Sequence, residues 1–94
     1  MKVVWSPRAV RHLAAIRDFI AEDNPSSAAD VAGKIVDAVE LLATHPELGR
    51  RGRSPGTREL VVAGTAFVIP YRIRRGRVEL IAVFHGRQKW PERL

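Results

Sequence analysis

Cysteine is absent from the 94-residue chain, which excludes a disulfide scaffold, a thiolate metal site and a catalytic cysteine. No apolar run approaches the roughly 18 to 20 residues that a membrane-spanning helix needs. The first residues also lack the long apolar core of a signal peptide. A chain of this length falls within the size of one domain. We therefore expect a single domain over residues 1–94, located in a reducing cytoplasm and without a membrane partner.

Motifs for metal binding and common catalytic chemistries are missing as well. No Gly-rich phosphate-binding loop follows an apolar run, and there is no HExxH motif. His12, His45 and His85 fall in three separate predicted elements, so they do not form a ligand cluster. We expect no metal, no cofactor and no small-molecule substrate.

Charge is distributed unevenly along the chain. Residues 1–49 hold five basic and seven acidic side chains, whereas residues 50–94 hold eleven basic and three acidic ones. Ten of those eleven basic residues are arginines, whose planar guanidinium groups match carboxylates and phosphates. The second half therefore indicates either a binding surface for an acidic partner or a solvated basic face of a sheet.

Two proline-containing start signals predict two helices. Ser6–Pro7 begins an amphipathic helix that runs to about residue 22, with apolar residues at spacings of three and four. Asn24–Pro25 begins a second helix, which His45–Pro46 ends because the residue before proline is disfavoured in helical geometry. The break between the helices is so short that an antiparallel helical hairpin is expected.

Strands are predicted at residues 2–5, 58–63, 66–74 and 77–85, with a loop at residues 46–57. If Arg75 and Gly76 form a two-residue turn, the following pairs face each other: Arg74 with Arg77, Ile73 with Val78, Arg72 with Glu79, Tyr71 with Leu80, Ile69 with Ala82, and Phe67 with Phe84. Pro70 cannot donate to the ladder, so we expect a bulge or an unpaired amide there.

This pairing places the apolar partners on a core face covered by the helices. The opposite face carries Arg72, Arg74, Arg77, Glu79 and His85, with Val68, Pro70, Ile81 and Val83 between them, and is basic toward the turn. The predicted fold class is α+β, with the order β-α-α-β-β-β. Its helical hairpin packs on one face of an antiparallel sheet of about four strands.

His85 is the strongest candidate for catalysis. Near Arg58, Arg72 and Arg87, its imidazole could activate a ribose 2′-OH while arginine stabilises phosphate charge. The alternative is a histidine at the end of a strand that bonds to the backbone or to solvent. Arg58 has a structural alternative too, packed beside Tyr71, and Trp90 could close the rim of a small core.

Four stretches, in this order and spacing, resemble the ParE branch of the RelE/ParE superfamily, the toxins of type II toxin-antitoxin modules. They cover nearly the whole chain and are WSPRAVRHLAAIRDFIAEDNPSSA, HPELGRRG, GTRELVV and VFHGRQKWP. The resemblance implies the strand, the helical hairpin and the antiparallel sheet described above. It also implies a ParD-like antitoxin, encoded beside the toxin, whose C-terminal region wraps around it. We expect the antitoxin to contact the apolar residues Leu13, Ile16, Ile20, Val31 and Ile35.

The two branches of the superfamily imply different activities. RelE-like members cut mRNA in the ribosome with basic residues and a late Tyr or His, whereas ParE-like members inhibit DNA gyrase. A nuclease site here would consist of His85, Arg58 and Arg72, but the only tyrosine is Tyr71 in mid-strand, and Lys89 is the only lysine after residue 50.

HGRQKWP and GTRELVV are more similar to the gyrase branch. We therefore expect growth inhibition through gyrase without a catalytic residue. The residues expected to bind the target are Arg72, Arg74, Arg87, Lys89 and Trp90. A RelE-like endoribonuclease and a non-catalytic basic nucleic-acid-binding module are the alternatives.

Overall fold

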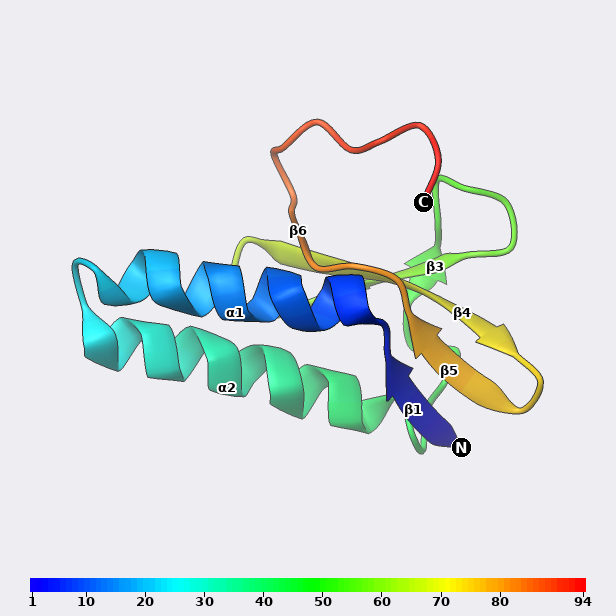
Figure 1. The fold of residues 1–94 in the computed structure, drawn as a ribbon. Helices are drawn as coiled ribbons and strands as arrows, with labels where there is room; N and C mark the ends of the chain where they lie inside the picture. Colours follow the sequence, from blue (N-terminus) through cyan, green and yellow to red (C-terminus); the bar gives the residue numbers. More distant parts are fainter.

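A computed structural model describes residues 1–94 as a pair of helices packed on a twisted sheet (Figure 1). The elements follow one another as β1 (Lys2–Trp5), α1 (Pro7–Ala21), α2 (Pro25–Leu41), β2 (Arg50–Arg51), β3 (Arg58–Val61), β4 (Phe67–Arg74), β5 (Arg77–Leu80) and β6 (Phe84–His85). The α+β class and the helical hairpin are confirmed. The sheet has six strands rather than about four, because β2 forms inside the expected loop and the last predicted strand is divided in two.

Both helices begin where the sequence predicts. The Ser6 hydroxyl oxygen accepts a hydrogen bond of 3.0 Å from the Ala9 amide, and the Asn24 side chain accepts one of 3.1 Å from Ser27. Each cap is followed by proline at the first helical position, where a missing N–H costs nothing. Neither helix is long and apolar enough to cross a membrane.

The sheet is mixed rather than wholly antiparallel. Its strand order is β1-β5-β4-β3-β2, and β6 also pairs with β4. β1 runs parallel to β5, with Lys2 opposite Arg77 and Trp5 opposite Leu80, whereas every other pair is antiparallel. A parallel pair of strands needs a long crossover connection, and here the helices and three strands lie between its members. The all-antiparallel expectation is therefore corrected at β1.

The β4–β5 hairpin has the predicted register near its turn. Arg75 and Gly76 both have positive φ angles, 56° and 72°, as a type I′ turn requires. Arg74 pairs with Arg77, Ile73 with Val78, Arg72 with Glu79 and Tyr71 with Leu80, all as predicted.

The register shifts by one residue beyond Leu80. Val68 lies opposite Phe84 and Phe67 opposite His85, so the predicted pairs of Ile69 with Ala82 and Phe67 with Phe84 are wrong. The Ile81 amide still donates to the Pro70 carbonyl at 2.9 Å, and the extra residue lies between Leu80 and Phe84. The bulge expected at Pro70 is not in β4, which runs continuously through Pro70 and pairs it with Glu59, because the additional residue lies on the facing segment between Leu80 and Phe84.

Hydrophobic side chains form one cluster on each face of the sheet. The larger cluster lies under the helices and contains Ala9, Ile35, Val39, Leu42, Leu60, Val62, Ile69, Tyr71, Val78, Leu80 and Val83. The smaller one contains Val68, Ala82, Phe84 and Trp90. Because of the bulge, Phe84 belongs to this second cluster, under the C-terminal segment, instead of the core beneath the helices.

The loop between α2 and β3 is fixed to the sheet by Tyr71. Its buried hydroxyl group accepts a hydrogen bond of 2.8 Å from the Gly49 amide and donates one of 2.7 Å to the Pro46 carbonyl. Burial raises the pKa of this phenol, which keeps it a donor. Arg58 pairs with Tyr71 across the sheet and donates to the Gly49 carbonyl at 2.9 Å. Arg58 therefore has a structural role.

Candidate partner-binding surface

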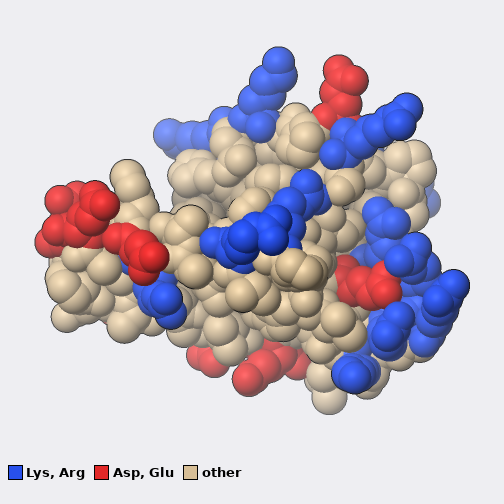
Figure 2. Space-filling model, in the orientation of Figure 1, with Lys and Arg blue, Asp and Glu red and all other residues tan.

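Basic side chains gather at the end of the molecule formed by the β4–β5 hairpin (Figure 2). Acidic side chains lie at the opposite end, where α1 turns into α2. The charge asymmetry in the sequence therefore becomes an asymmetry in space. A one-signed surface of this kind attracts acidic partners over distances comparable with the Debye length.

The arginines of the hairpin are organised around one carboxylate. Glu79 Oε1 lies 3.0 Å from Arg74 Nε, and its Oε2 lies 3.3 Å from Arg77 Nη2. Arg72 pairs with Glu79 across the strands, but it forms no ion pair, and its buried Nε has no hydrogen-bond partner. The three predicted arginines of the basic face are thus together, and Arg72 is the one of them that forms no ion pair.

His85 lies away from this basic face, contrary to the sequence prediction. The shifted register places its ring in an edge-on contact with Phe67, 5.7 Å between centroids, in a groove that it shares with His12 and Ile16 of α1. Its Nδ1 accepts a hydrogen bond of 3.0 Å from the Arg87 amide. The expectation of His85 on the basic side is therefore wrong, and the physical reason is the bulge.

The three residues of the possible nuclease site line three different pockets. Arg72 lines a pocket at the N-terminus of α1, Arg58 lines one beside the loop of residues 51–57, and His85 lines the groove along α1. Phosphoryl transfer needs a proton carrier and charged donors around one phosphate. The structure does not bring these three side chains together.

The C-terminal segment is pinned to the sheet by Trp90, which is only 8% exposed. Its ring packs against Phe84 with centroids 4.8 Å apart, and the Arg53 guanidinium lies 3.4 Å from the centroid of the Trp90 ring. Arg87 and Lys89 are exposed on this segment. Trp90 therefore fits the structural alternative, in which it closes the rim of a small core. To bind a target, its side chain would first have to leave this packed position.

The apolar stripe expected to bind an antitoxin faces the protein core. Ile35 is fully buried, and Leu13, Ile16 and Val31 pack against the larger cluster. Ile20 is half-buried. An amphipathic helix packs on its own sheet through its apolar stripe. The apolar stripe alone therefore does not identify a surface for a partner protein. The large apolar side chains exposed on and beside the helices are Val10, Phe19, Leu41 and Leu48.

His12 supports the bulge from α1. Its Nδ1 accepts a hydrogen bond of 3.1 Å from the Val83 amide, and its ring packs against Phe84 with centroids 5.5 Å apart. Burial, followed by the positive charges of Arg8 and Arg11, lowers the pKa of His12 below 6.5. Only the neutral ring can accept the Val83 hydrogen bond.

We therefore expect stability to depend on pH through His12. The stabilisation is complete above pH 6.5, the ordinary value, and is lost as the pH falls through the lowered pKa of the folded state. Urea unfolding between pH 5 and 8 measures this, with His12→Asn as the comparison, because asparagine offers an acceptor that does not titrate. An equal decline of both proteins below pH 6.5 would contradict the assignment.

Comparisons with known proteins agree with this architecture. The family model described as the ParE toxin of the type II toxin-antitoxin system parDE matches residues 3–90. Y4kP of Sinorhizobium fredii is 45% identical over 91 residues, which cover 97% of this chain and 94% of that protein. Toxin RelE2 of Caulobacter vibrioides is 38% identical over 90% of this chain and 94% of its own length.

The fold is also similar to a solved structure, a chain of the chromosomal ParDE toxin-antitoxin system of P. aeruginosa. The TM-score is 0.81 with 25% sequence identity, over 90% of this chain and 95% of that one. Family model, relatives and fold converge on one assignment, which also implies an antitoxin partner. The chain belongs to the ParE toxin family of type II toxin-antitoxin systems.

Proposed function

We propose that this toxin inhibits DNA gyrase by binding, with no catalytic residue of its own. The proposed contact surface is the basic hairpin and the exposed residues that follow β6, namely Arg72, Arg74, Arg87 and Lys89. Charge complementarity and a few anchoring side chains are sufficient for a protein-protein or protein-DNA interface.

The separation of the nuclease candidates is the observation that carries this proposal. His85, Arg58 and Arg72 line three pockets, and Arg58 is engaged with the Gly49 carbonyl. The Nδ1 atom of His85 already accepts from the backbone, which leaves only Nε2 for chemistry. His85 is therefore separated from two of the three arginines, Arg58 and Arg72, that were expected to stabilise phosphate charge beside it.

The second candidate is RelE-like, ribosome-dependent cleavage of mRNA. It is supported by the similarity to two Caulobacter vibrioides proteins named RelE2 and RelE3, at 38% and 34% identity. In both candidate functions the toxin arrests growth and is neutralised by an antitoxin.

Purified toxin assayed in parallel for gyrase supercoiling and for ribosome-dependent mRNA cleavage distinguishes the two. We expect inhibition of supercoiling and intact mRNA, with Arg72→Glu weakening inhibition more than His85→Ala does. Cleaved mRNA together with unimpaired supercoiling would contradict the proposal. Binding only to nucleic acid, with a steep dependence on salt, would instead indicate a basic nucleic-acid-binding module.

A further inference from the structure

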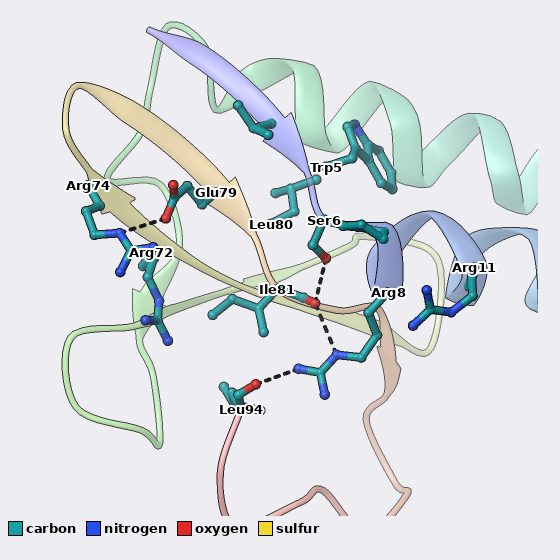
Figure 3. Close-up of a pocket in the computed structure, with 12 residues that line it drawn as sticks. Trp5, Ser6, Arg8, Arg11, Arg72, Arg74, Glu79, Leu80, Ile81 and Leu94 are labelled. Carbon is teal, nitrogen blue, oxygen red and sulfur yellow. Dashed lines mark hydrogen bonds and ion pairs between the residues drawn. The ribbon is translucent and has the colours of Figure 1, made fainter.

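The pocket between α1 and the strands β1, β4 and β5 contains four arginines, but the protein itself engages two of them (Figure 3). Arg8 Nη2 donates to the Leu94 main-chain oxygen at 2.7 Å, and Arg74 Nε lies 3.0 Å from the Glu79 carboxylate. The other two arginines lie at opposite ends of the pocket. This pocket therefore does not present its positive charge to one ligand.

A second pocket, of about 620 Å³, combines unpaired positive charge with small polar groups beside the loop of residues 51–57. Its two basic residues are Arg51 of β2 and Arg58 of β3, and no acidic residue lines it. Ile73 is the one hydrophobic residue of the lining. The pocket therefore suits an anion with little apolar surface.

The pairing of β2 with β3 places Arg51 and Arg58 side by side. They are direct partners on two antiparallel strands, so their side chains project from the same face of the sheet. The neighbouring pair, Arg50 and Glu59, lies on the opposite face and is joined by an ion pair of 3.1 Å. Arg51 and Arg58 form no ion pair, and like charges directly opposite each other destabilise a sheet. An anion between the two guanidinium groups would remove this repulsion.

Arg58 and Arg51 both retain donors for such an anion. Arg58 Nη1 is held by the carbonyl oxygens of Glu47 and Gly49, at 3.3 and 2.9 Å, whereas its Nε and Nη2 donate to no group of the chain. The Arg51 side chain is exposed and forms no hydrogen bond. One guanidinium group is thus fixed by the fold, and the other is free to approach a ligand from solvent.

The loop that borders the pocket is closed by its own hydrogen bonds and has unused donors. The Gly52 amide donates to the Thr57 carbonyl at 2.8 Å, and the buried Thr57 hydroxyl group donates to the Ser54 carbonyl at 2.6 Å. Gly56 has a positive φ angle of 75°, which glycine adopts without strain. The amides of Ser54 and Gly56 and the Ser54 hydroxyl group donate to no group of the chain. The loop therefore adds neutral donors to the two arginines.

We propose that this pocket binds a phosphate group through Arg51, Arg58 and the free donors of the loop. A tetrahedral phosphate accepts hydrogen bonds from several directions, and its oxygens match the fork of a guanidinium group. The same chemistry is offered by the phosphodiester backbone of a nucleic acid and by free phosphate. None of these residues belongs to the proposed gyrase surface, so the inference goes beyond the proposed function and does not depend on it.

The direct test is an NMR titration of the isotope-labelled full chain, followed through the amide signals of Ser54 and Gly56 and the Nε–H signals of Arg51 and Arg58. The probes are an oligothymidylate hexamer and inorganic phosphate, and sodium acetate at the same ionic strength is the control. We expect both phosphate compounds to shift these signals in a saturable way, and acetate to leave them in place.

The order of the two affinities identifies the source of the phosphate. Saturation at a lower concentration of oligothymidylate indicates a nucleic-acid backbone, and saturation at a lower concentration of inorganic phosphate indicates free phosphate. Equal shifts with acetate, or no shift with either phosphate compound, would overturn the proposal.

Two variants test the contribution of Arg51. Arg51→Gln removes a charge from the pocket, and Arg17→Gln removes the same charge from an exposed position of α1 outside it. We expect Arg51→Gln to weaken the binding of both phosphate compounds about tenfold, the effect of losing one charge-assisted hydrogen bond. Arg17→Gln is expected to change it less than about twofold. Equal affinities of the two variants would overturn the proposal.

The stability of Arg51→Gln separates a ligand site from a structural role. Without phosphate, the variant should melt about 2 °C higher than the unaltered chain, because it lacks the repulsion between Arg51 and Arg58. Added phosphate should then raise the melting temperature of the unaltered chain more than that of the variant. A lower melting temperature of Arg51→Gln without phosphate would show that Arg51 supports the fold, and would overturn the proposal.

Discussion

Replacing Gly49 with alanine is expected to lower the free energy of unfolding by about 3 kcal/mol, because the new methyl group has no space. A Cβ atom at Gly49 would lie 2.6 Å from Tyr71 Cε1, 2.7 Å from the Tyr71 hydroxyl oxygen and 3.0 Å from the Glu59 carbonyl oxygen. The Tyr71 side chain is fully buried and hydrogen-bonded at its hydroxyl group, so it cannot move aside. Urea unfolding measures the loss.

Gly33 provides the matched control on α2. A Cβ atom there meets nothing within 4 Å, and the position is exposed in the middle of the helix. Alanine at this position should therefore stabilise the protein by about 0.5 to 1 kcal/mol, the usual gain in helix propensity. If Gly49→Ala and Gly33→Ala changed stability in the same direction, the close approach of Gly49 to Tyr71 would be wrong.

Glu59→Gln is expected to destabilise the fold by about 2 kcal/mol. Glu59 is only 3% exposed, and its carboxylate accepts hydrogen bonds from Arg50 Nη2 at 3.1 Å, from Arg53 Nε at 3.0 Å and from the Arg53 amide at 2.8 Å. Burial alone would raise the pKa of Glu59, but these bonds outweigh it and hold the pKa below its ordinary value. Both arginine side chains are about half exposed, so solvent screening keeps the effect moderate.

The same variant should loosen the C-terminal segment, since Arg53 bonds to Glu59 and also covers the Trp90 ring. Hydrogen exchange of residues 86–94 measures this, with Glu92→Gln as the control at an exposed acidic position. Unchanged unfolding and unchanged exchange in Glu59→Gln would show that the network contributes nothing to stability.

Features encoded by a few neighbouring residues could be predicted from the sequence. Ser6–Pro7 and Asn24–Pro25 specify the helix starts through local hydrogen bonds and the fixed φ of proline. The turn at Arg75–Gly76 fixes the hairpin register as far as Leu80, because each cross-strand pair follows from the previous one. These signals are short-range and act in the same way whatever the rest of the chain does.

Features that depend on distant contacts could not be predicted. β1 and β5 pair although both helices and three strands separate them in the sequence. No local sequence signal in either strand specifies this pairing. The bulge beyond Leu80 places His85 in the groove along α1 instead of on the basic face. His85 therefore lies apart from Arg58 and Arg72, the residues predicted to form a nuclease site with it. The apolar stripe containing Ile35 marks the protein's own core, since helix periodicity alone cannot distinguish a core from an interface.

The proposal that this toxin acts by binding rather than by phosphoryl transfer is tested most directly by His85→Ala. The measurement is growth arrest after expression without the antitoxin, together with circular dichroism and antitoxin binding to establish that the variant is folded. We expect His85→Ala to arrest growth nearly as well as the unaltered toxin, whereas Arg72→Glu weakens the arrest clearly. Loss of growth arrest in a folded, antitoxin-binding His85→Ala variant, with mRNA fragments produced by the unaltered toxin, would contradict it.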